Sequence, residues 1–333
     1  MLNVGVIGAG SWGTALSNLL ANKGNKVKLW DLDADLLSYI AANRENKKYL
    51  AGIELHEYIE ISQSDEVASK DVDILLMAVP AQHFRAAFTR IAGNLNPKTV
   101  VVNVAKGIEQ GALKTISQIA FEVSPHQPYA ILSGPSHAEE VGAGMPTTVS
   151  VASKVAGTAE FVQDSFITDR FRVYTSSDVL GLELGGALKN IIALGAGISD
   201  GMGFGDNTKA ALMSRGITEI TRLGVKMGAL ETTFYGLSGI GDLIVTCTSM
   251  HSRNRRCGIM IGEGTPPSEA TAKVGMVVEG IYTAEAAHDL AKKYDVEMPI
   301  TESIYQVIQG QMKPSDALDI LMNREKKSEQ EPI

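Results

Sequence analysis

The residues of this chain best suited to proton chemistry are one lysine and one aspartate in its second half. Lys189 lies in an otherwise apolar run with helical spacing, from Leu182 to Asn190, where small residues allow close packing. Burial there would lower the pKa of its amine toward neutrality, which suits a group that donates or accepts a proton. Snorkelling of Lys189 to solvent is an equally favoured interpretation of this helix alone. Asp242 follows two glycines and is read either as an acid of the same site or as a turn residue.

A second group of residues has the chemistry of an anion site. The run Ser252-Arg253-Asn254-Arg255-Arg256 places hydroxyl, amide and guanidinium donors within five residues, and Arg binds phosphate through a planar fork. Lys106 follows the strand expected from Thr99 to Val104 and adds a cation at the carboxyl edge of a sheet, where α/β proteins bind ligands. Taken singly, a solvated loop is the commoner interpretation of such a basic run. The combination with Lys189 and Asp242 favours a site for a phosphorylated carbonyl compound.

The first half carries a glycine-rich motif, Gly8-Ala9-Gly10-Ser11-Trp12-Gly13, in the pattern G-x-G-x-x-G. It follows an apolar strand from Leu2 to Ile7 and opens a helix from Ser11 to Ala21, which is the context that a dinucleotide-binding turn requires. A pyrophosphate would lie at the helix N-terminus, and Trp12 would cover the cofactor. A plain tight turn between strand and helix is the alternative.

Asp31 lies just after a second predicted strand, 23 residues beyond Gly8. An acidic side chain there would bind the ribose hydroxyls of NAD and repel a 2′-phosphate, and Asp33 adds negative charge nearby. Because residues 31–33 include no Arg or Lys, we expect NAD as the preferred cofactor, with NADP as a possible one. The alternative is that both aspartates only cap a helix or lie in solvent.

The elements that must position these residues alternate in the first half and change character near Ser177. The first half has the near-continuous apolar runs of parallel strands separated by helical patterns, and the second half has long helical patterns rich in Ala, Leu, Gly and Met. The sequence therefore predicts an α/β doubly wound sheet of the Rossmann type followed by an all-helical C-terminal domain. The expected limits are 1–177, 178–325 and a frayed tail at 326–333. The remaining strands are expected at 27–30, 74–79, 129–132, 147–152 and 172–174, and the clearest helices at 33–42, 84–92, 178–197, 209–227, 283–294 and 301–309.

Composition limits the class of protein. A length of 333 residues favours two domains, and a net charge of −8 argues against general binding to nucleic acid. The chain has two cysteines, Cys247 and Cys257, which favours a reducing compartment. The start of the chain shows no export signal, and the most apolar later stretch is too short to span a membrane. We therefore expect a cytoplasmic protein without membrane insertion. His137 and His251 lack the spacing of metal ligands, so no metal is expected, and packing is the favoured role of the cysteines.

Six linked motifs, in order and spacing over nearly the whole chain, resemble those of bacterial NAD(P)-dependent glycerol-3-phosphate dehydrogenase. They are 8–13, Ala105-Lys106-Gly107-Ile108-Glu109, Ser133-Gly134-Pro135-Ser136-His137-Ala138, Leu188-Lys189-Asn190, 239–249 and Ser252-Arg253-Asn254-Arg255. The resemblance implies a Rossmann domain followed by a helical domain with the site in the cleft. It further implies interconversion of sn-glycerol 3-phosphate and dihydroxyacetone phosphate by hydride transfer, supplying phospholipid synthesis. Many members carry Arg near 32 and 33 to hold the 2′-phosphate of NADP, whereas this chain has Leu32 and Asp33.

The resemblance also implies roles for particular residues. The cofactor would be lined by the glycine-rich turn and by Ser11, Trp12, Lys106, Ala138, Arg253, Val277 and Glu279. The substrate would be surrounded by Lys106, Gly134, Ser136, Lys189, Asn190, Asp242, Thr246, Ser252, Arg253 and Asn254. Lys189 would be the general acid/base, and Asp242 would orient it. Asn190 and Thr246 complete the predicted catalytic set.

Two rival functions fit parts of the same pattern. One is a dehydrogenase of the same build that acts on a sugar acid or a hydroxy acid. The other is a redox sensor that binds NAD without catalysis, although a sensor has no need of Lys189, Asp242 and Arg253 together. The apolar helical half also makes a homodimer the expected assembly.

Overall fold

The computed structural model describes residues 1–326 and 328–329 and separates into two compact units. We call the first the sheet unit; it contains Met1–Ala105 and Ile116–Val179. The second, the helical unit, contains Lys106–Thr115 and the chain from Leu180 onward. Most of the predicted tail at 326–333 lies outside the described residues. The segment Lys106–Thr115 therefore belongs with helices that follow it by more than 60 residues in the sequence.

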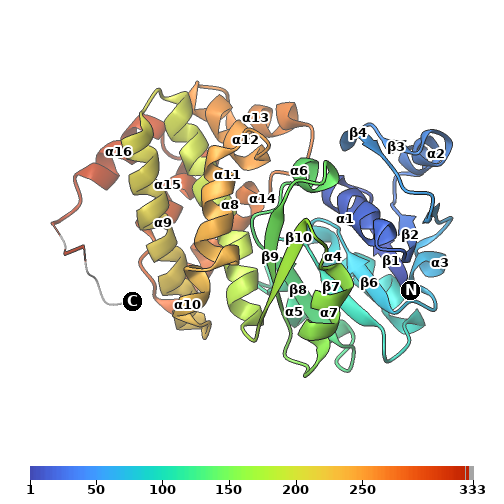
Figure 1. The fold of residues 1–333 in the computed structure, drawn as a ribbon. Coiled ribbons are helices and arrows are strands. Elements are labelled where there is room, and N and C mark those ends of the chain that lie inside the picture. Colours follow the sequence, from blue (N-terminus) through green and yellow to red (C-terminus); the bar gives the residue numbers. More distant parts are fainter. Residues whose placement is uncertain (327, 330–333) are drawn as a thin grey trace. The chain divides into compact units, whose positions relative to one another are not determined.

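The sheet unit is built on one eight-stranded sheet in the order β10-β9-β8-β7-β6-β1-β2-β5 (Figure 1). Every neighbouring pair is parallel except β8 and β9, which are antiparallel. This arrangement confirms the doubly wound fold. The strands are β1 (Asn3–Ile7), β2 (Lys26–Trp30), β5 (Ile59–Ile61), β6 (Ile74–Met77), β7 (Val100–Asn103), β8 (Tyr129–Ser133), β9 (Thr147–Ala152) and β10 (Phe171–Ser176).

Helices cover both faces of this sheet, which explains why its central strands are apolar without interruption. Leu76 of β6 packs in the same core cluster as Leu16 of α1, whereas its neighbour Met77 packs in a second cluster with Phe84 of α4. Successive strand residues point to opposite faces, so both faces of β6 must be apolar. The helices of this unit are α1 (Ser11–Asn22), α2 (Ala34–Asn43), α3 (Asp65–Ser69), α4 (Ala81–Ile91), α5 (Ile116–Val123), α6 (Ala138–Gly142) and α7 (Thr158–Phe166), with a small hairpin of β3 (Glu45–Asn46) and β4 (Leu50–Glu54).

The helical unit follows the sheet, as the sequence predicts. Two helices that the periodicity identifies, α8 and α9, are its longest. The short helices around the predicted anion site were not individually expected, because each has too few turns to show a clear period. The helices are α8 (Val179–Gly201), α9 (Asp206–Met227), α10 (Glu231–Phe234), α11 (Asp242–Thr248), α12 (Arg253–Gly262), α13 (Pro267–Val274), α14 (Glu279–Tyr294), α15 (Pro299–Ile308) and α16 (Pro314–Met322).

Glycines bring α8 and α12 into direct backbone contact. Gly197 and Gly201 on α8 face Gly258 and Gly262 on α12, with the two α-carbons of each facing pair among the nearest atoms. A Cβ on Gly258 would lie 2.1 Å from the carbonyl oxygen of Leu194. No side chain fits at this crossing, so the two helices are held at a fixed separation.

The helix α8 is long and apolar enough to cross a membrane when judged by length and composition alone. However, 94% of its most apolar 18-residue window is buried within the protein. A core helix of a soluble protein has the same two properties. Its apolar composition is therefore accounted for by packing against the rest of the chain.

We expect Gly258→Ala to destabilise the protein, although alanine is favoured over glycine in a helix interior by about 1 kcal/mol. The added methyl would force α8 and α12 apart, and overpacking of this kind typically costs about 1–3 kcal/mol. Urea denaturation followed by circular dichroism measures the free energy of unfolding. A higher denaturation midpoint for the variant would show that the crossing tolerates a side chain.

Candidate active site

The glycine-rich turn has a backbone that only glycine fits at two of its positions. Gly8 follows β1 with φ +109°, and a Cβ there would lie 2.5 Å from the carbonyl oxygen of Ala78. A Cβ on Gly13 would lie 2.0 Å from the carbonyl oxygen of Gly8, so α1 packs directly against the turn. Gly10 has no atom near its missing side chain, which leaves open space beside the backbone. The turn therefore has the shape that the motif predicts.

The start of α1 offers donors for an anion. Gly10 is the N-cap and supplies no side chain to the first turn of the helix. The hydroxyl of Ser11 is buried and has no hydrogen-bond partner among the described residues. Unpaired N–H groups at a helix N-terminus, together with the helix dipole, favour a phosphate. These residues therefore fit the pyrophosphate of a dinucleotide.

Asp31 secures this turn from the end of β2. Its Oδ2 accepts a hydrogen bond from the Ala9 amide at 2.7 Å, and its Oδ1 accepts one from the Asp33 amide at 3.0 Å. Each carboxylate oxygen can accept a second hydrogen bond, so ribose hydroxyls can still be bound. Asn46, which the sequence did not single out, donates to the Ala9 carbonyl at 2.7 Å from 37 residues away.

Asp33 has a structural role that the sequence allowed as an alternative. It caps α2 by accepting a hydrogen bond from the Leu36 amide, and it pairs with Lys48 at 2.8 Å. The lysine and this amide hold the pKa of the Asp33 carboxyl below its usual range. Both side chains of the pair are substantially exposed, so the pair adds little to stability.

Lys189 is buried in the helical unit and belongs to a cluster of four predicted site residues. Its Nζ lies 2.7 Å from Oδ1 of Asp242 and 2.5 Å from Oγ1 of Thr246. Lys106 binds the other oxygen of Asp242, Oδ2, at 2.6 Å. One carboxylate is thus held between two ammonium groups, and the snorkelling interpretation of Lys189 is wrong.

The surroundings of this cluster shift the pKa values of Lys189 and Asp242. Burial lowers the pKa of Lys189 to about 8. The positive charge of Lys106 also lowers this pKa, whereas the negative charge of Asp242 raises it. Burial alone would raise the pKa of Asp242, yet Lys106 and Lys189 keep it below its usual range. Asp242 is therefore ionised at neutral pH, while Lys189 can gain or lose a proton close to it, as a general acid/base requires.

Helix α11 places Asp242 and Thr246 on one face because they are four residues apart. The hydroxyl of Thr246 donates to the carbonyl oxygen of Asp242 at 2.6 Å, so its oxygen is free to accept from Lys189. A π-type turn, Leu237–Gly241, leads into the helix. A Cβ on Gly239 would lie 2.0 Å from the carbonyl oxygen of Phe234. Gly239 thus allows the tight turn that precedes Asp242 and the start of α11.

Two asparagines join the helices that carry the other predicted substrate residues. Asn254 of α12 donates to Oδ1 of Asn190 on α8 at 2.9 Å. Its own Oδ1 accepts the amide of Gly280 at the start of α14, at 2.8 Å. A Cβ on Gly280 would lie 2.6 Å from the carbonyl oxygen of Asn190. Gly280, which sequence reasoning missed, is therefore part of the support for both asparagines.

The remaining predicted residues of the helical unit lie at two helix starts. Ser252 is the N-cap of α12, where its hydroxyl accepts from the Arg255 amide at 3.2 Å. Arg253 is the first residue of α12 and donates to the carbonyl oxygen of Val277 at 3.3 Å. Glu279 is the first residue of α14. The structure therefore brings Arg253 to the segment where the cofactor residues Val277 and Glu279 are predicted.

Three further predicted residues of the sheet unit lie just after β8. Gly134 has φ +147°, and a Cβ there would lie 3.0 Å from the α-carbon of Val149. Ser136 donates its hydroxyl proton to the carbonyl oxygen of Gly134 at 2.9 Å. Ala138 is buried at the start of α6. This turn stands at the carboxyl end of β8, the end at which parallel strands carry ligand sites.

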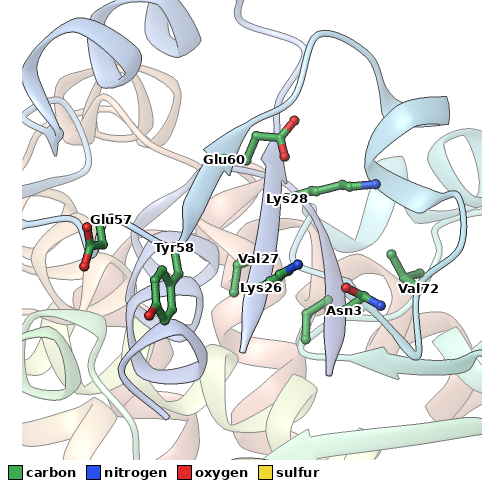
Figure 2. Close-up of a pocket in the computed structure, with 9 residues that line it drawn as sticks. Asn3, Lys26, Val27, Lys28, Glu57, Tyr58, Glu60 and Val72 are labelled. Carbon is green, nitrogen blue, oxygen red and sulfur yellow. The ribbon is translucent and has the colours of Figure 1, made fainter. Parts of the chain in front are cut away.

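The hollow drawn in Figure 2 lies at the other ends of the strands. Its volume is about 230 Å³. Asn3 and Lys26, which pair with each other where β1 and β2 begin, line it together with Lys28 and Tyr58 (Figure 2). None of the predicted site residues lines it. It therefore does not compete with the glycine-rich turn as the cofactor site.

Neither cysteine of the chain supports thiol chemistry. Cys247 and Cys257 are buried and form no disulfide. Burial raises the pKa of the Cys247 thiol to about 12, although Lys189 opposes this shift. A thiolate is the reactive form of cysteine, so packing remains the better interpretation of both residues.

These features agree on a class of protein. The sheet unit has the dinucleotide-binding turn in its proper context, and the helical unit buries an amine whose pKa suits proton transfer to or from a carbonyl oxygen. Cofactor enzymes of this kind leave the hydride to the nicotinamide and supply the proton from a side chain. Fold and site together define an NAD(P)-dependent dehydrogenase.

Comparison with known proteins gives the family. Residues 3–159 match the model for the N-terminus of NAD-dependent glycerol-3-phosphate dehydrogenase, and residues 178–319 match that for its C-terminus. The chain belongs to this family.

Similar proteins and a solved structure support the same family assignment. A glycerol-3-phosphate dehydrogenase [NAD(P)+] of Desulfitobacterium hafniense is 50% identical, with 100% of this chain and 94% of that protein covered. The one from Bacillus subtilis is 49% identical, with 100% and 97% covered. A crystal structure of the Coxiella burnetii glycerol-3-phosphate dehydrogenase superposes with a TM-score of 0.94 at 37% identity, covering 97% of this chain and 99% of that one.

The pH dependence of carbonyl reduction should report the pKa of Lys189. A general acid must be protonated to act, so with Lys189 in its predicted role kcat/KM for reduction should fall as pH rises through about 8. Lys106→Met removes a positive charge that lowers this pKa, and the falling limb should therefore move to higher pH. Lys226→Met, at an exposed position of α9, is the control and should leave the limb in place. A limb that stays unchanged in Lys106→Met would contradict the electrostatic account.

Proposed function

We propose that this protein interconverts sn-glycerol 3-phosphate and dihydroxyacetone phosphate with a nicotinamide dinucleotide, and that Lys189 is its general acid/base. The observation that carries the proposal is the buried contact of Lys189 with Asp242 and Thr246, at 2.7 and 2.5 Å. Relatives about 50% identical over the whole chain are named glycerol-3-phosphate dehydrogenase [NAD(P)+], which supports the same substrate.

The cofactor assignment rests on the fit of the glycine-rich turn. The open backbone at Gly10 and the buried hydroxyl of Ser11 suit the pyrophosphate, and Asp31 is at the right distance in sequence for the ribose. When bound, the nicotinamide supplies or accepts the hydride. We assign to cofactor binding Gly8, Gly10, Ser11, Trp12, Gly13, Asp31, Lys106, Ala138, Arg253, Val277 and Glu279.

The substrate assignment rests on charge. Lys106 and Lys189 both pair with Asp242, and two ammonium groups at one place suit an anionic ligand. Arg253, with its planar fork, and Asn254 add donors suited to a phosphate ester. We assign to substrate binding Lys106, Gly134, Ser136, Lys189, Asn190, Asp242, Thr246, Ser252, Arg253 and Asn254.

In the reductive direction, Lys189 donates the proton that the carbonyl oxygen needs as its carbon receives the hydride. The neutral amine left behind is stabilised by its buried surroundings, which lower its pKa. Asp242 accepts a hydrogen bond from the amine and fixes its direction, and Thr246 accepts a second one. In the oxidative direction, the neutral Lys189 removes the proton from the alcohol.

The proposal also covers the metabolic role, the cellular compartment and the assembly of the protein. Glycerol 3-phosphate made by such an enzyme supplies phospholipid synthesis, and the reducing cytoplasm suits a chain with two free, buried cysteines. We also propose a homodimer, because Leu230, Tyr235 and Ile244 of the helical unit are each about half exposed and would be buried in an interface. Sedimentation velocity measures the assembly directly.

The direct test is the absorbance of NADH after dihydroxyacetone phosphate is added to the protein. We expect the absorbance to fall, and Lys189→Ala to slow this turnover by about 10²–10⁴-fold, the usual contribution of general acid catalysis. Cofactor affinity, measured by NADH fluorescence, should change far less. Lys106 still neutralises Asp242 in this variant, so the fold should persist. The exposed Lys226→Ala is the control, and near-normal turnover in Lys189→Ala would remove the assignment of Lys189.

Cofactor preference is tested separately by equilibrium binding and by kinetics. Asp31 and Asp33 carry negative charge near the predicted ribose position, and a 2′-phosphate would be repelled there. NADH should therefore bind more tightly than NADPH and give the higher kcat/KM. Asp33→Asn should narrow the difference by weakening this repulsion. A clear preference of the wild-type protein for NADPH would refute the assignment of Asp31 and Asp33.

A further inference from the structure

Arg255 lies among the donors that the sequence assigns to an anion site, yet its guanidinium is already engaged within the protein. Its Nε and Nη2 each lie 2.8 Å from Oδ2 of Asp200. Its Nη1 donates to the carbonyl oxygen of Thr248 at 2.9 Å. Both side chains of the pair are only 14% exposed, so solvent screens the pair weakly. Arg255 is therefore a structural partner of Asp200 and not a free phosphate donor.

Asp200 receives a second cation. Its other oxygen, Oδ1, lies 2.8 Å from Nζ of Lys209 on α9. Lys209 also approaches Asp206, at 3.8 Å, but the Asp206 side chain is fully exposed. The partly buried carboxylate of Asp200 thus connects the end of α8 to both α9 and α12.

The contacts of Arg255 reach every helix that carries a proposed catalytic or phosphate-binding residue in the helical unit. Asp200 lies on α8, eleven residues beyond Lys189. Thr248 is the last residue of α11, the helix of Asp242 and Thr246. Arg255 itself lies in the first turn of α12, two residues after Arg253. One side chain therefore connects three helices.

The glycine crossing of α8 and α12 cannot supply this connection by itself. It fixes the separation of the helices, with Gly197 against the backbone of Arg255, but apolar contacts of this kind have no preferred direction. A guanidinium held by a carboxylate and a carbonyl is directional, because its donors lie in one plane at fixed angles. The orientation of the first turn of α12 therefore depends on Arg255 and Asp200, together with the hydrogen bond from Asn254 to Asn190.

We propose that Asp200 and Arg255 are positioning residues for substrate binding. They hold Ser252, Arg253 and Asn254 in register with Lys189, and neither contacts the substrate. This inference rests on the proposed function, since the substrate is the phosphate ester assigned there. Loss of Asp200 would leave Arg255 and Lys209 without their common counter-ion, and the first turn of α12 would keep its polar attachment to α8 only through Asn254 and Asn190.

The test is the steady-state kinetics of Asp200→Asn with NADH saturating and dihydroxyacetone phosphate varied. We expect KM to rise by about tenfold or more, which is the effect of weakening one hydrogen bond to a charged phosphate. The cluster of Lys189, Asp242 and Thr246 is not touched by Asp200, so kcat should change less than KM and its pH limb should stay in place. An unchanged KM in a folded Asp200→Asn protein overturns the proposal.

Asp206→Asn is the matched control. It removes the same charge from the neighbourhood of the same lysine, but Asp206 is exposed and does not contact Arg255. Its KM should equal that of the wild-type protein. A rise as large as that of Asp200→Asn would show that the net charge of the region, and not the pair of Asp200 and Arg255, is responsible.

Two further variants keep the proposal falsifiable if Asp200→Asn fails to fold. Arg255→Lys keeps the charge but cannot reach Asp200 and Thr248 together, so KM should rise while the protein stays folded. Lys209→Gln keeps the pair of Asp200 and Arg255, so KM should stay within about twofold, as expected for a change outside the positioning network. The opposite pattern, with Lys209→Gln impaired and Arg255→Lys normal, overturns the proposal.

The two hypotheses fail in different ways. If the wild-type protein does not oxidise NADH with dihydroxyacetone phosphate, the proposed function is wrong. If it does so and Arg255→Lys and Asp200→Asn both keep the wild-type KM, the function stands and the positioning role is wrong.

Discussion

The helical unit depends on the burial of one negative charge, the carboxylate of Asp242, between two ammonium groups. A carboxylate removed from water is strongly unfavourable unless it is paired and hydrogen-bonded, and Asp242 is only 1% exposed. Lys106 and Lys189 each bind a different oxygen of it. The need to bring both lysines to this point governs where α8, α11 and the segment Lys106–Thr115 must lie.

The same cluster sets the pKa of Lys189. Burial destabilises the protonated amine of Lys189, and the positive charge of Lys106 destabilises it further. The attraction of Asp242 keeps the amine from losing its proton altogether near neutral pH. The balance leaves the pKa of Lys189 at about 8, where both protonation states are accessible. The general acid/base role proposed for Lys189 needs both states, one for each direction of the reaction.

Sequence reasoning succeeded where the signal was local and missed what depended on distant contacts. The strand, glycine turn and helix from Asn3 to Asn22 were predicted because strand, turn and helix are contiguous and each has its own pattern. The support that Asn46 gives to Ala9 spans 37 residues, and the contact of Asp200 with Arg255 spans 55. No periodicity or spacing encodes such pairs, so Arg255 was grouped with the anion donors of its own segment.

The site residues show the same contrast between local sequence signals and long-range contacts. Lys189 and Asp242 were singled out by residue type within apolar or glycine-rich surroundings, but their contact at 2.7 Å is a product of the tertiary fold. Gly280 had no signal at all, because its importance comes from the backbone of Asn190 lying where a side chain would be. Which of these residues touch the cofactor and the substrate stays a prediction.

The position of the segment Lys106–Thr115 affects how this chain folds during synthesis. It lies between two stretches of the sheet unit in sequence but packs with the helical unit, where Ile108 is part of the core. Lys106 and its partner Asp242 are 136 residues apart. During synthesis the sheet can assemble while this segment still lacks the residues it will pack against, and long-range contacts of this kind form late. The two halves are therefore not independent modules: a helical half produced alone from residue 178 would lack both Ile108 and one of the two cations around Asp242.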